Sequence, residues 1–351
     1  MAIALEVAGR MSRCSSIDLK TVLFQEVNRQ SSEYVNVSVS CTGAKSFFDL
    51  HGIKNLWRLI AEFQPEVVHV HHTASAFWGS ILAKLVAGAA VIRTEHNNQQ
   101  HYTLPQNILH GCSQLLADRV LCNSKDTYCN LYPLQKWAIG DNWEVVYNGI
   151  DVLRIDAAVD RASPVCLEKL EDRVLVGSVG RLVDQKNYGR LLQAFPSVVQ
   201  ESPEAHLVLV GDGENRTELE QEAVAQGIED RVTFLGECSR DDVYAALHAF
   251  DLFVMPSLWE GFCNAVVEAM AAGLPIVSSD ISTLREVVGE VAVYVDPEDP
   301  EDIARGIVNL LNEASEVLSE RGQACQERAV EQYSLEKTVE GYLSVYEKLT
   351  N

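Results

Sequence analysis

A chain of 351 residues that is 47% hydrophobic and 22% charged has the composition of a globular protein, and its length predicts two domains. The formal net charge of −22 at pH 7 argues against nucleic acid or an anionic bilayer as the main partner. No apolar run is long enough to span a membrane, since the most apolar region, residues 74–92, is interrupted by Lys84 and Gly88.

The first half of the chain alternates short β-branched runs with stretches of helical periodicity, such as residues 56–63 and 77–86. This alternation is typical of a parallel sheet whose strands are connected by helices. Strands are expected at residues 3–7, 35–40, 67–70, 90–94, 119–122 and 144–146.

The same alternation restarts after residues 151–170, a segment that has no strong periodicity and contains Pro164. Strands are expected in this second half at residues 174–179, 206–210, 232–235, 252–255, 275–278 and 292–295. The expected organisation is α/β, with two doubly wound Rossmann-like domains facing a central cleft, where open α/β sheets bind ligands. The domains are predicted at residues 1–155 and 156–334; a final helix within residues 335–351 either joins the second domain or crosses back to the first.

The excess negative charge lies entirely in the second half. Residues 1–155 contain 13 Lys or Arg and 13 Asp or Glu, whereas residues 156–351 contain 15 and 37. The neutral first half is therefore the part that tolerates an anionic or membrane-borne partner.

The nine cysteines include no C-x-x-C pair and no even spacing, which is typical of reduced, buried thiols. The amino-terminal residues also lack the successive basic, apolar and small-residue regions of a secretory signal peptide. These features predict a cytoplasmic protein.

The segment 254–275 carries the strongest chemical signal. A loop with Glu260 and Gly261 follows a strand, and a helix is expected to begin near Asn264, a favoured N-cap residue. The amino end of a helix favours phosphate, so Glu260 and Glu268 are placed to face a phosphorylated ligand. The alternative is that neither residue binds a ligand: Glu268 is an acidic residue in the first turn that interacts favourably with the helix dipole, and Glu260 is exposed to solvent.

Two cations follow the strand predicted at residues 174–179. Gly180 places Arg181 at the carboxyl edge of the sheet, and Lys186 comes five residues later. An arginine fork and a lysine point charge can together clamp a diphosphate. The alternative is that both are ordinary surface cations, although cations at a strand end stand out in so acidic a domain.

Six landmarks, in this order, resemble those of the retaining glycosyltransferases of family 4 (glycosyl transferases group 1), which have the GT-B architecture of two Rossmann-like domains. They are Thr-Glu-His at 94–96, Leu-Cys-Asn-Ser at 121–124, Tyr-Asn-Gly-Ile-Asp at 147–151, Gly-Arg-Leu-Val-Asp-Gln-Lys-Asn at 180–187, Leu-Val-Gly-Asp-Gly at 209–213, and the pair Glu260 and Glu268. The resemblance covers roughly residues 35–349 and implies transfer of a sugar from a nucleotide-diphosphate donor, with retention of the anomeric configuration.

The resemblance implies roles for single residues. Glu268 is similar to the residue that binds the ribose hydroxyls, and Glu260 to the one at the transferred sugar. Arg181 and Lys186 resemble the cations that stabilise the departing diphosphate, where negative charge develops. His96 is similar to a first-domain histidine near the reaction centre; the alternative is a hydrogen-bonded polar residue at a strand end. The other residues expected at the donor are Gly180, Gly261, Phe262, Cys263 and Asn264.

The histidines at positions 69, 71 and 72 are candidate metal ligands, since residues 69 and 71 share a face of a strand. No further ligand stands at suitable spacing, which favours strand-end packing or acceptor contact. The acidic run 296–302 resembles a loop and helix cap. No metal or other cofactor is expected, because the nucleotide-sugar is a substrate.

The first loop departs from the family's pattern. Relatives have a glycine-rich loop after the first strand, whereas residues 9–16 contain one glycine and two arginines. Cys263 is a smaller departure, in a position that relatives often fill with glycine or proline.

The expected donor is a UDP- or GDP-linked sugar; the sequence does not identify the acceptor, and a lipid-linked glycan, a polysaccharide and a small metabolite are the alternatives. The first domain is expected to present this acceptor, with peripheral membrane contact but no insertion. Two other functions remain open: a nucleotide-sugar epimerase of the same architecture, and a catalytically silent GT-B binding protein, for which the altered first loop is the support.

Overall fold

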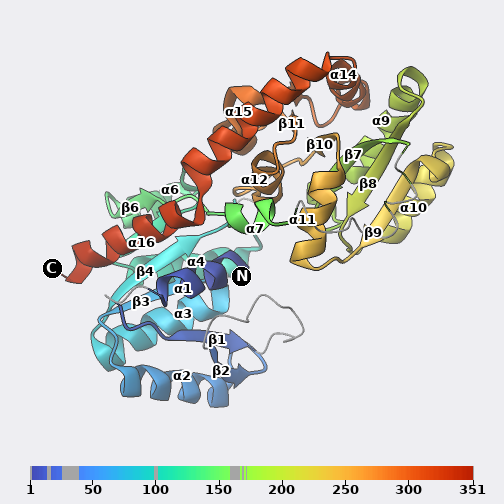
Figure 1. The fold of residues 1–351 in the computed structure, drawn as a ribbon. Coiled ribbons are helices and arrows are strands. Elements are labelled where there is room, and N and C mark those ends of the chain that lie inside the picture. Colours follow the sequence, from blue (N-terminus) through green and yellow to red (C-terminus); the bar gives the residue numbers. More distant parts are fainter. Residues whose placement is uncertain are drawn as a thin grey trace. The chain divides into compact units, whose positions relative to one another are not determined.

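The computed structural model describes residues 2–13, 17–25, 39–98, 102–158, 167, 170 and 172–350. The chain divides into two compact units: unit 1 comprises residues 1–149 and 335–351, and unit 2 comprises residues 150–334 (Figure 1). Within the described ranges, no helix has both the length and the apolar character needed to cross a bilayer.

Unit 2 contains six parallel strands in the order β12-β11-β10-β7-β8-β9. The chain winds outward in one direction from β7 and in the other from β10, so the topological switch point lies between these two neighbouring strands. The six strands predicted for this half are confirmed to within one residue at either end. They are β7 (Val174–Val179), β8 (Ala205–Val210), β9 (Val232–Gly236), β10 (Leu252–Met255), β11 (Ile276–Ser279) and β12 (Val293–Val295).

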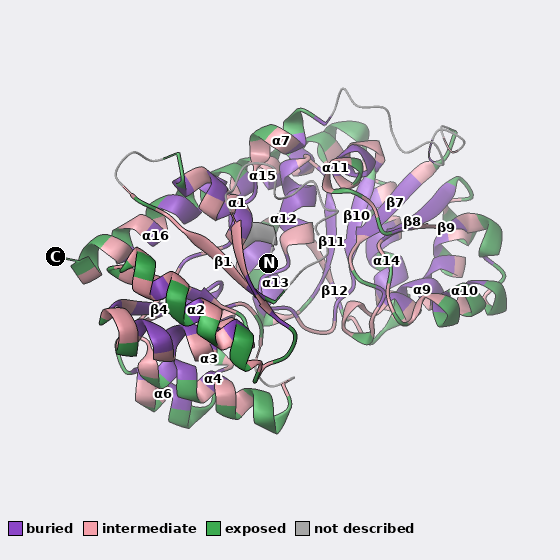
Figure 2. Cartoon of the chain, turned by 90° about the horizontal axis from the view of Figure 1, so that it is seen from below, coloured by how far each residue is buried: buried purple, intermediate pink, exposed green. Residues whose placement is uncertain are grey.

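The core of unit 2 explains why its strands read as continuous apolar runs. Every residue of β8 and of β10 is buried, because helices cover both faces of a doubly wound sheet. Figure 2 shows β7, β8 and β10 as buried strands, whereas α9 and α10 carry exposed faces. The helices are α7 (Val152–Asp156), α9 (Tyr188–Glu201), α10 (Arg216–Ala225), α11 (Arg240–Ala249), α12 (Asn264–Ala271), α13 (Ser282–Val288), α14 (Pro300–Leu311) and α15 (Ser315–Tyr333).

Unit 1 contains two parallel sheets, a four-stranded one in the order β3-β4-β5-β6 and a two-stranded one formed by β1 and β2. The strands predicted from residue 67 to residue 146 are confirmed to within one residue, whereas β1 was not predicted. The prediction at 35–40 overlaps β2 at residues 39 and 40, and residues 35–38 lie outside the described ranges. The strands are β1 (Thr21–Gln25), β2 (Val39–Ala44), β3 (Val67–His71), β4 (Ala90–Glu95), β5 (Arg119–Cys122) and β6 (Trp143–Val145).

The helices of unit 1 include the last helix of the chain. Tyr342 and Val345 of this helix share an apolar cluster with Val7 and Met11. The helix predicted at 77–86 begins earlier and ends in a π-helical turn, Ala83–Ala87. The helices are α1 (Ala2–Met11), α2 (Leu50–Phe63), α3 (Thr73–Leu82), α4 (Leu104–Leu116), α5 (Lys125–Cys129), α6 (Pro133–Ile139) and α16 (Leu335–Thr350).

The strand predicted at residues 3–7 is wrong, because these residues lie in α1. A short apolar run does not separate helix from strand by its periodicity, and Ala, Leu, Glu and Met favour the helix. The interpretation of residues 9–16 as a loop after the first strand is wrong with it. Residues 9–11 are helical, Ser12 and Arg13 follow as a turn, and residues 14–16 lie outside the described ranges. Arg10 pairs with Glu336 of α16 rather than with a loop ligand.

Candidate functional site

The two loops singled out in the sequence meet at the switch point of unit 2. Gly180 and Arg181 follow β7, and Glu260 lies in the loop after β10, the strand that pairs with β7. Open α/β sheets bind ligands at the carboxyl ends of such strands. The chain hydrogen-bonds across this edge, with the Leu258 amide donating to the Gln185 carbonyl at 2.9 Å.

A buried ion pair joins the two loops. Lys186 Nζ lies 2.7 Å from Glu260 Oε1, and the two side chains are 13% and 8% exposed. Ser257 Oγ donates to the same carboxylate oxygen at 2.8 Å. Gln185 Nε2 reaches the other oxygen at 3.3 Å, and Thr283 Oγ1 donates to the Glu260 carbonyl at 2.9 Å. The carboxylate is therefore held at one position by an ammonium, a hydroxyl and an amide.

The surroundings of the ion pair fix the protonation of Lys186. Burial alone lowers the pKa of Lys186, but electrostatic interaction with Cys263 and with Glu260 outweighs burial and raises that pKa. Burial, followed by repulsion from Glu260, raises the pKa of Cys263 to about 12. Cys263 is therefore a neutral thiol at pH 7. Lys186 stays cationic throughout the physiological range.

Gly180 allows Lys186 to lie against the backbone. A Cβ at Gly180 would sit 2.9 Å from Lys186 Cε and 2.9 Å from the Tyr188 hydroxyl. We expect Gly180→Ala to displace the ammonium and to lower kcat/KM about 10- to 100-fold, because small misplacements of catalytic groups have such effects. The thermal midpoint is expected to change by less than about 4 °C, since a flexible side chain absorbs the contact.

Gly189→Ala is the matched control in α9, because a Cβ there meets nothing within 4 Å. Parallel rate measurements and thermal melts on both variants separate the two effects. Equal activity of the two variants would show that the close approach at Gly180 has no bearing on the reaction.

The amino end of α12 adjoins the ion pair, and its N-cap residue differs from the expectation. Helix α12 begins at Asn264, and Cys263 is its N-cap, with φ at 70° in the left-handed region. Gly261, Phe262 and Cys263 are buried in this turn, and Cys263 Sγ lies 4.0 Å from Lys186 Nζ. The positive end of the helix dipole and the lysine ammonium therefore lie close together, as an anion site requires.

Glu268 has a partner that was not predicted. Arg240 Nη2 lies 2.7 Å from Glu268 Oε1, and the two side chains are 14% and 7% exposed. Arg240 Nε also donates to the Tyr244 hydroxyl at 2.9 Å. The structure thus separates the two glutamates, with Glu260 on Lys186 and Glu268 on Arg240. Nothing in the spacing of residues 239–244 predicts this contact. The sequence indicates there only the start of a helix, through Ser239, the N-cap residue of α11.

Arg181 is exposed at the carboxyl edge of β7. Among the described residues, its guanidinium forms no ion pair, unlike the guanidinium of Arg240. An exposed arginine and a buried lysine therefore both follow β7, and both carry positive charge.

His96 lies in unit 1, directly after β4. Its Nε2 lies 2.9 Å from His71 Nδ1, and its carbonyl accepts from Asn123 Nδ2 at 3.0 Å. His69 bonds to Thr94 Oγ1 at 2.6 Å and to the Tyr346 hydroxyl at 2.7 Å. These rings are hydrogen-bonded to one another and to their neighbours, and the described residues contain no group of three or more His, Cys, Asp or Glu arranged to hold a metal ion.

Burial and neighbouring histidines keep these rings neutral. Burial, followed by repulsion from His71 and His72, lowers the pKa of His96 well below its usual range. Burial, followed by repulsion from His72, lowers the pKa of His71 to about 3. At pH 7 His96 therefore acts through hydrogen bonds rather than through a positive charge.

These lowered pKa values predict acid lability. An unfolded histidine takes up a proton near pH 6.5 whereas folded His71 does so only near pH 3, so stability present above pH 6.5 is lost as the pH falls below it. The free energy of unfolding should fall by up to about 1.4 kcal/mol per pH unit for each such ring. Denaturant titrations at pH 7.5, 6.0 and 5.0 measure this slope; His71→Gln should reduce it, whereas His51→Gln, at an exposed position, should not.

Two family models match the chain in succession. The Glycosyltransferase Family 4 model matches residues 23–154, and the Glycosyl transferases group 1 model matches residues 162–331. An uncharacterized glycosyltransferase of Methanocaldococcus jannaschii is 28% identical over 268 residues, which are 71% of this chain and 66% of that protein. The UDP-Gal:alpha-D-GlcNAc-diphosphoundecaprenol alpha-1,3-galactosyltransferase of Escherichia coli is 24% identical over 331 residues, 88% of this chain and 82% of the relative.

The fold of the chain is also similar to that of solved structures. The crystal structure of Anabaena HepE in complex with UDP and glucose matches with a TM-score of 0.81 and 19% identity, and covers 99% of this chain and 96% of HepE. This likeness shows the GT-B fold, and the family models that match both halves show that the chain belongs to the glycosyltransferases of family 4 and group 1.

Proposed function

We propose that this protein transfers a hexose from a nucleotide-diphosphate sugar to a lipid-linked glycan or related polysaccharide, with retention of the anomeric configuration. The observation that carries the proposal is the buried Lys186–Glu260 pair beside the amino end of α12, at the switch point of unit 2. Lysine and a helix amino end suit a diphosphate, and a fixed carboxylate suits sugar hydroxyls.

The proposed donor is a UDP-sugar, with a GDP-sugar as the alternative. The E. coli relative is named for UDP-Gal, and the HepE structure contains UDP. Glu268 is assigned to the ribose hydroxyls and Glu260 to a hydroxyl of the transferred sugar. Arg181, Lys186 and the loop residues Gly180, Gly261, Phe262, Cys263 and Asn264 are assigned to the diphosphate and its surroundings.

The proposed reaction is a front-face displacement. The bond between the anomeric carbon and the phosphate oxygen breaks, and its electron pair stays with the departing nucleoside diphosphate. The acceptor hydroxyl oxygen bonds to the anomeric carbon from the same face, and its proton passes to the departing phosphate. Lys186 and Arg181 stabilise the charge that develops there. His96, a neutral ring, is assigned a hydrogen bond to the transferred sugar, and no metal ion is required.

The proposed acceptor side is unit 1. Among the described residues, ten of the fourteen most exposed large apolar side chains lie in this unit, including Leu50, Trp137 and Phe48 at 80%, 78% and 72% exposure. Such side chains suit a lipid-linked acceptor at a membrane surface. The proposal places the enzyme in the cytoplasm, where the seven cysteines within the described ranges, all free thiols, stay reduced.

The test is a transfer assay with defined substrates. Purified protein is incubated with UDP-galactose, UDP-glucose or GDP-mannose and a short-chain polyprenyl diphosphate GlcNAc acceptor, and the product is examined by proton NMR. The expected product is one glycoside whose anomeric coupling matches that of the donor. An inverted linkage would overturn the retaining mechanism, and a donor converted to its epimer without acceptor would identify the epimerase instead.

A further inference from the structure

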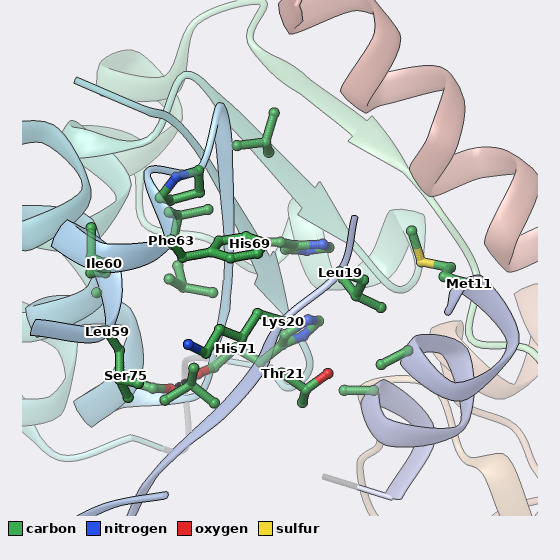
Figure 3. A pocket seen from close by; sticks show the side chains of 18 of the residues that line it. Met11, Leu19, Lys20, Thr21, Leu59, Ile60, Phe63, His69, His71 and Ser75 are labelled. Carbon is green, nitrogen blue, oxygen red and sulfur yellow. Dashed lines mark hydrogen bonds between the residues drawn. The ribbon is translucent and has the colours of Figure 1, made fainter. Parts of the chain in front are cut away.

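The histidines of β3 and the residue after it form a row of rings that ends on His96. His69 and His71 lie on one face of β3, with ring centroids 4.4 Å apart (Figure 3). The ring of His96 lies against two others, with its centroid 5.2 Å from that of His71 and 5.4 Å from that of His72. The position of the His96 ring therefore depends on how the backbone after β3 places His72.

That backbone has a strained conformation. His72 has φ at 58° and ψ at 155°, in a region that is almost exclusive to glycine. Such a conformation persists only where surrounding contacts impose it, and it occurs preferentially at functional sites. One contact comes from Ser75, which lies beside His71 in Figure 3 and whose Oγ donates to the carbonyls of His71 and His72. The other contact comes from the residue that follows His72.

This residue, Thr73, is tied to a buried histidine. Thr73 Oγ1 lies 2.8 Å from Nε2 of His110, which is buried. A hydroxyl can donate or accept, so the bond forms with either tautomer of the ring. His110 belongs to α4, which packs against α3, the helix that begins at Thr73. Helix α4 thus fixes the first residue of α3, and with it the backbone at His72.

His110 is held in turn by a buried ion pair at the end of β4. The guanidinium of Arg93 pairs with the carboxylate of Glu95, and both side chains are buried. His110 Nδ1 contacts Arg93 Nη2 and lies 3.3 Å from Glu95 Oε2. Burial alone raises the pKa of Glu95, but the charge of Arg93 and hydrogen bonds from His110 and Arg93 outweigh it and lower that pKa well below its ordinary value. Both charges are therefore present at pH 7.

We propose that His110 is a positioning residue for the transfer reaction, because it holds the strained backbone at His72 and thereby the ring of His96. Glu95 directly precedes His96, and Thr73 directly follows His72. Since His110 contacts both Glu95 and Thr73, it links the two ends of the site. Apolar side chains would stabilise this core at least as well as a buried ion pair, whereas buried charges can select one arrangement of the backbone. The inference rests on the proposed role of His96 at the transferred sugar.

The matched test is Thr73→Val beside Thr73→Ser. Valine has the shape of threonine but no hydroxyl, whereas serine keeps the bond to His110. Thr73→Val is expected to lower kcat about tenfold, because small misplacements at a reaction centre have effects of this size. The KM for the donor should stay within about threefold, since the residues assigned to the nucleotide and diphosphate lie in unit 2. Thr73→Ser should keep the original kcat, and equal kcat values of the two variants would overturn the proposal.

His72→Gly separates positioning from support of the fold. Glycine adopts the backbone conformation of residue 72 without strain, so the thermal midpoint should hold or rise by up to about 4 °C. The kcat should nevertheless fall about tenfold or more, because the ring against His96 is lost. A midpoint that falls together with kcat would mean that the ring only supports the fold, and an unchanged kcat would remove it from the reaction; either result contradicts the proposal.

The spectrum of the histidine rings tests the geometry without any substrate. The full chain is labelled with nitrogen-15 in its nine histidines, and the His96 signals are identified by their loss in His96→Gln. Thr73→Val is expected to shift the ring signals of His96 and His72, and Thr73→Ser to leave them in place. Identical signals in both variants would overturn the proposal. If the original chain transfers no sugar, the proposed function fails, and these spectra still decide whether His110 holds the two rings.

Discussion

Lys186→Met is expected to lower kcat for sugar transfer about 10²- to 10³-fold, the loss seen when a preorganised group that stabilises developing charge is removed. The Lys186 side chain is 13% exposed and its Nζ lies 2.7 Å from Glu260 Oε1, so no solvent cation can replace it efficiently. The same change leaves a buried carboxylate without its partner and should lower the free energy of unfolding by about 3–5 kcal/mol. Rates are therefore measured well below the melting temperature, together with denaturant unfolding.

The control for this variant is the double substitution Lys186→Met with Glu260→Gln. It removes both charges from the buried site, so it should recover most of the lost stability. Activity should stay low, because the cation for the leaving diphosphate is still missing. Recovery of activity along with stability would assign Lys186 a structural role alone.

Glu268→Gln is expected to weaken donor binding about 10- to 100-fold, with a change in kcat of less than about threefold. A hydrogen bond to a charged group contributes about 1.5–3 kcal/mol, which corresponds to this range of dissociation constants. The Glu268 side chain is 7% exposed, so the substitution acts inside a buried site and not on a surface charge. Titration calorimetry with the donor, with transfer rates at saturation, measures both quantities.

Arg240→Gln separates the two possible roles of Glu268. Arg240 forms an ion pair with Glu268 at 2.7 Å, and its removal leaves in place the carboxylate that is assigned to the ribose. Donor affinity is then expected to remain within about threefold of the original. A loss as large as that of Glu268→Gln would mean that the pair only supports the fold and does not bind the nucleotide.

The sheet of unit 2 was predictable because its signals are local. Strands such as β10 are short apolar runs followed by turn residues, and the structure places β10 at the predicted residues, Leu252–Met255. The Lys186 and Glu260 contact was not predicted: the sequence placed each residue in a loop after a strand, and it is the pairing of β7 with β10 that brings the two loops together at one edge of the sheet.

The parts that escaped prediction depend on contacts between distant residues. Residues 3–7 form a helix that packs against α16, more than 300 residues away along the chain. Arg240 reaches Glu268 across 28 positions, and no motif marks that pair. Cys263 adopts a positive φ of 70°, a conformation that a cysteine rarely takes and that its residue type does not announce.

The central claim is that the switch-point site of unit 2 binds a nucleotide-diphosphate sugar through Glu268 and Lys186. Saturation-transfer NMR of the purified protein with UDP-glucose, UDP-galactose and GDP-mannose tests it most directly, with Glu268→Gln as the matched variant. The expected result is saturation of the ribose and sugar protons of one donor, lost in the variant. Folded protein that saturates no donor, or a variant that binds as well as the original chain, would contradict the assignment of this site.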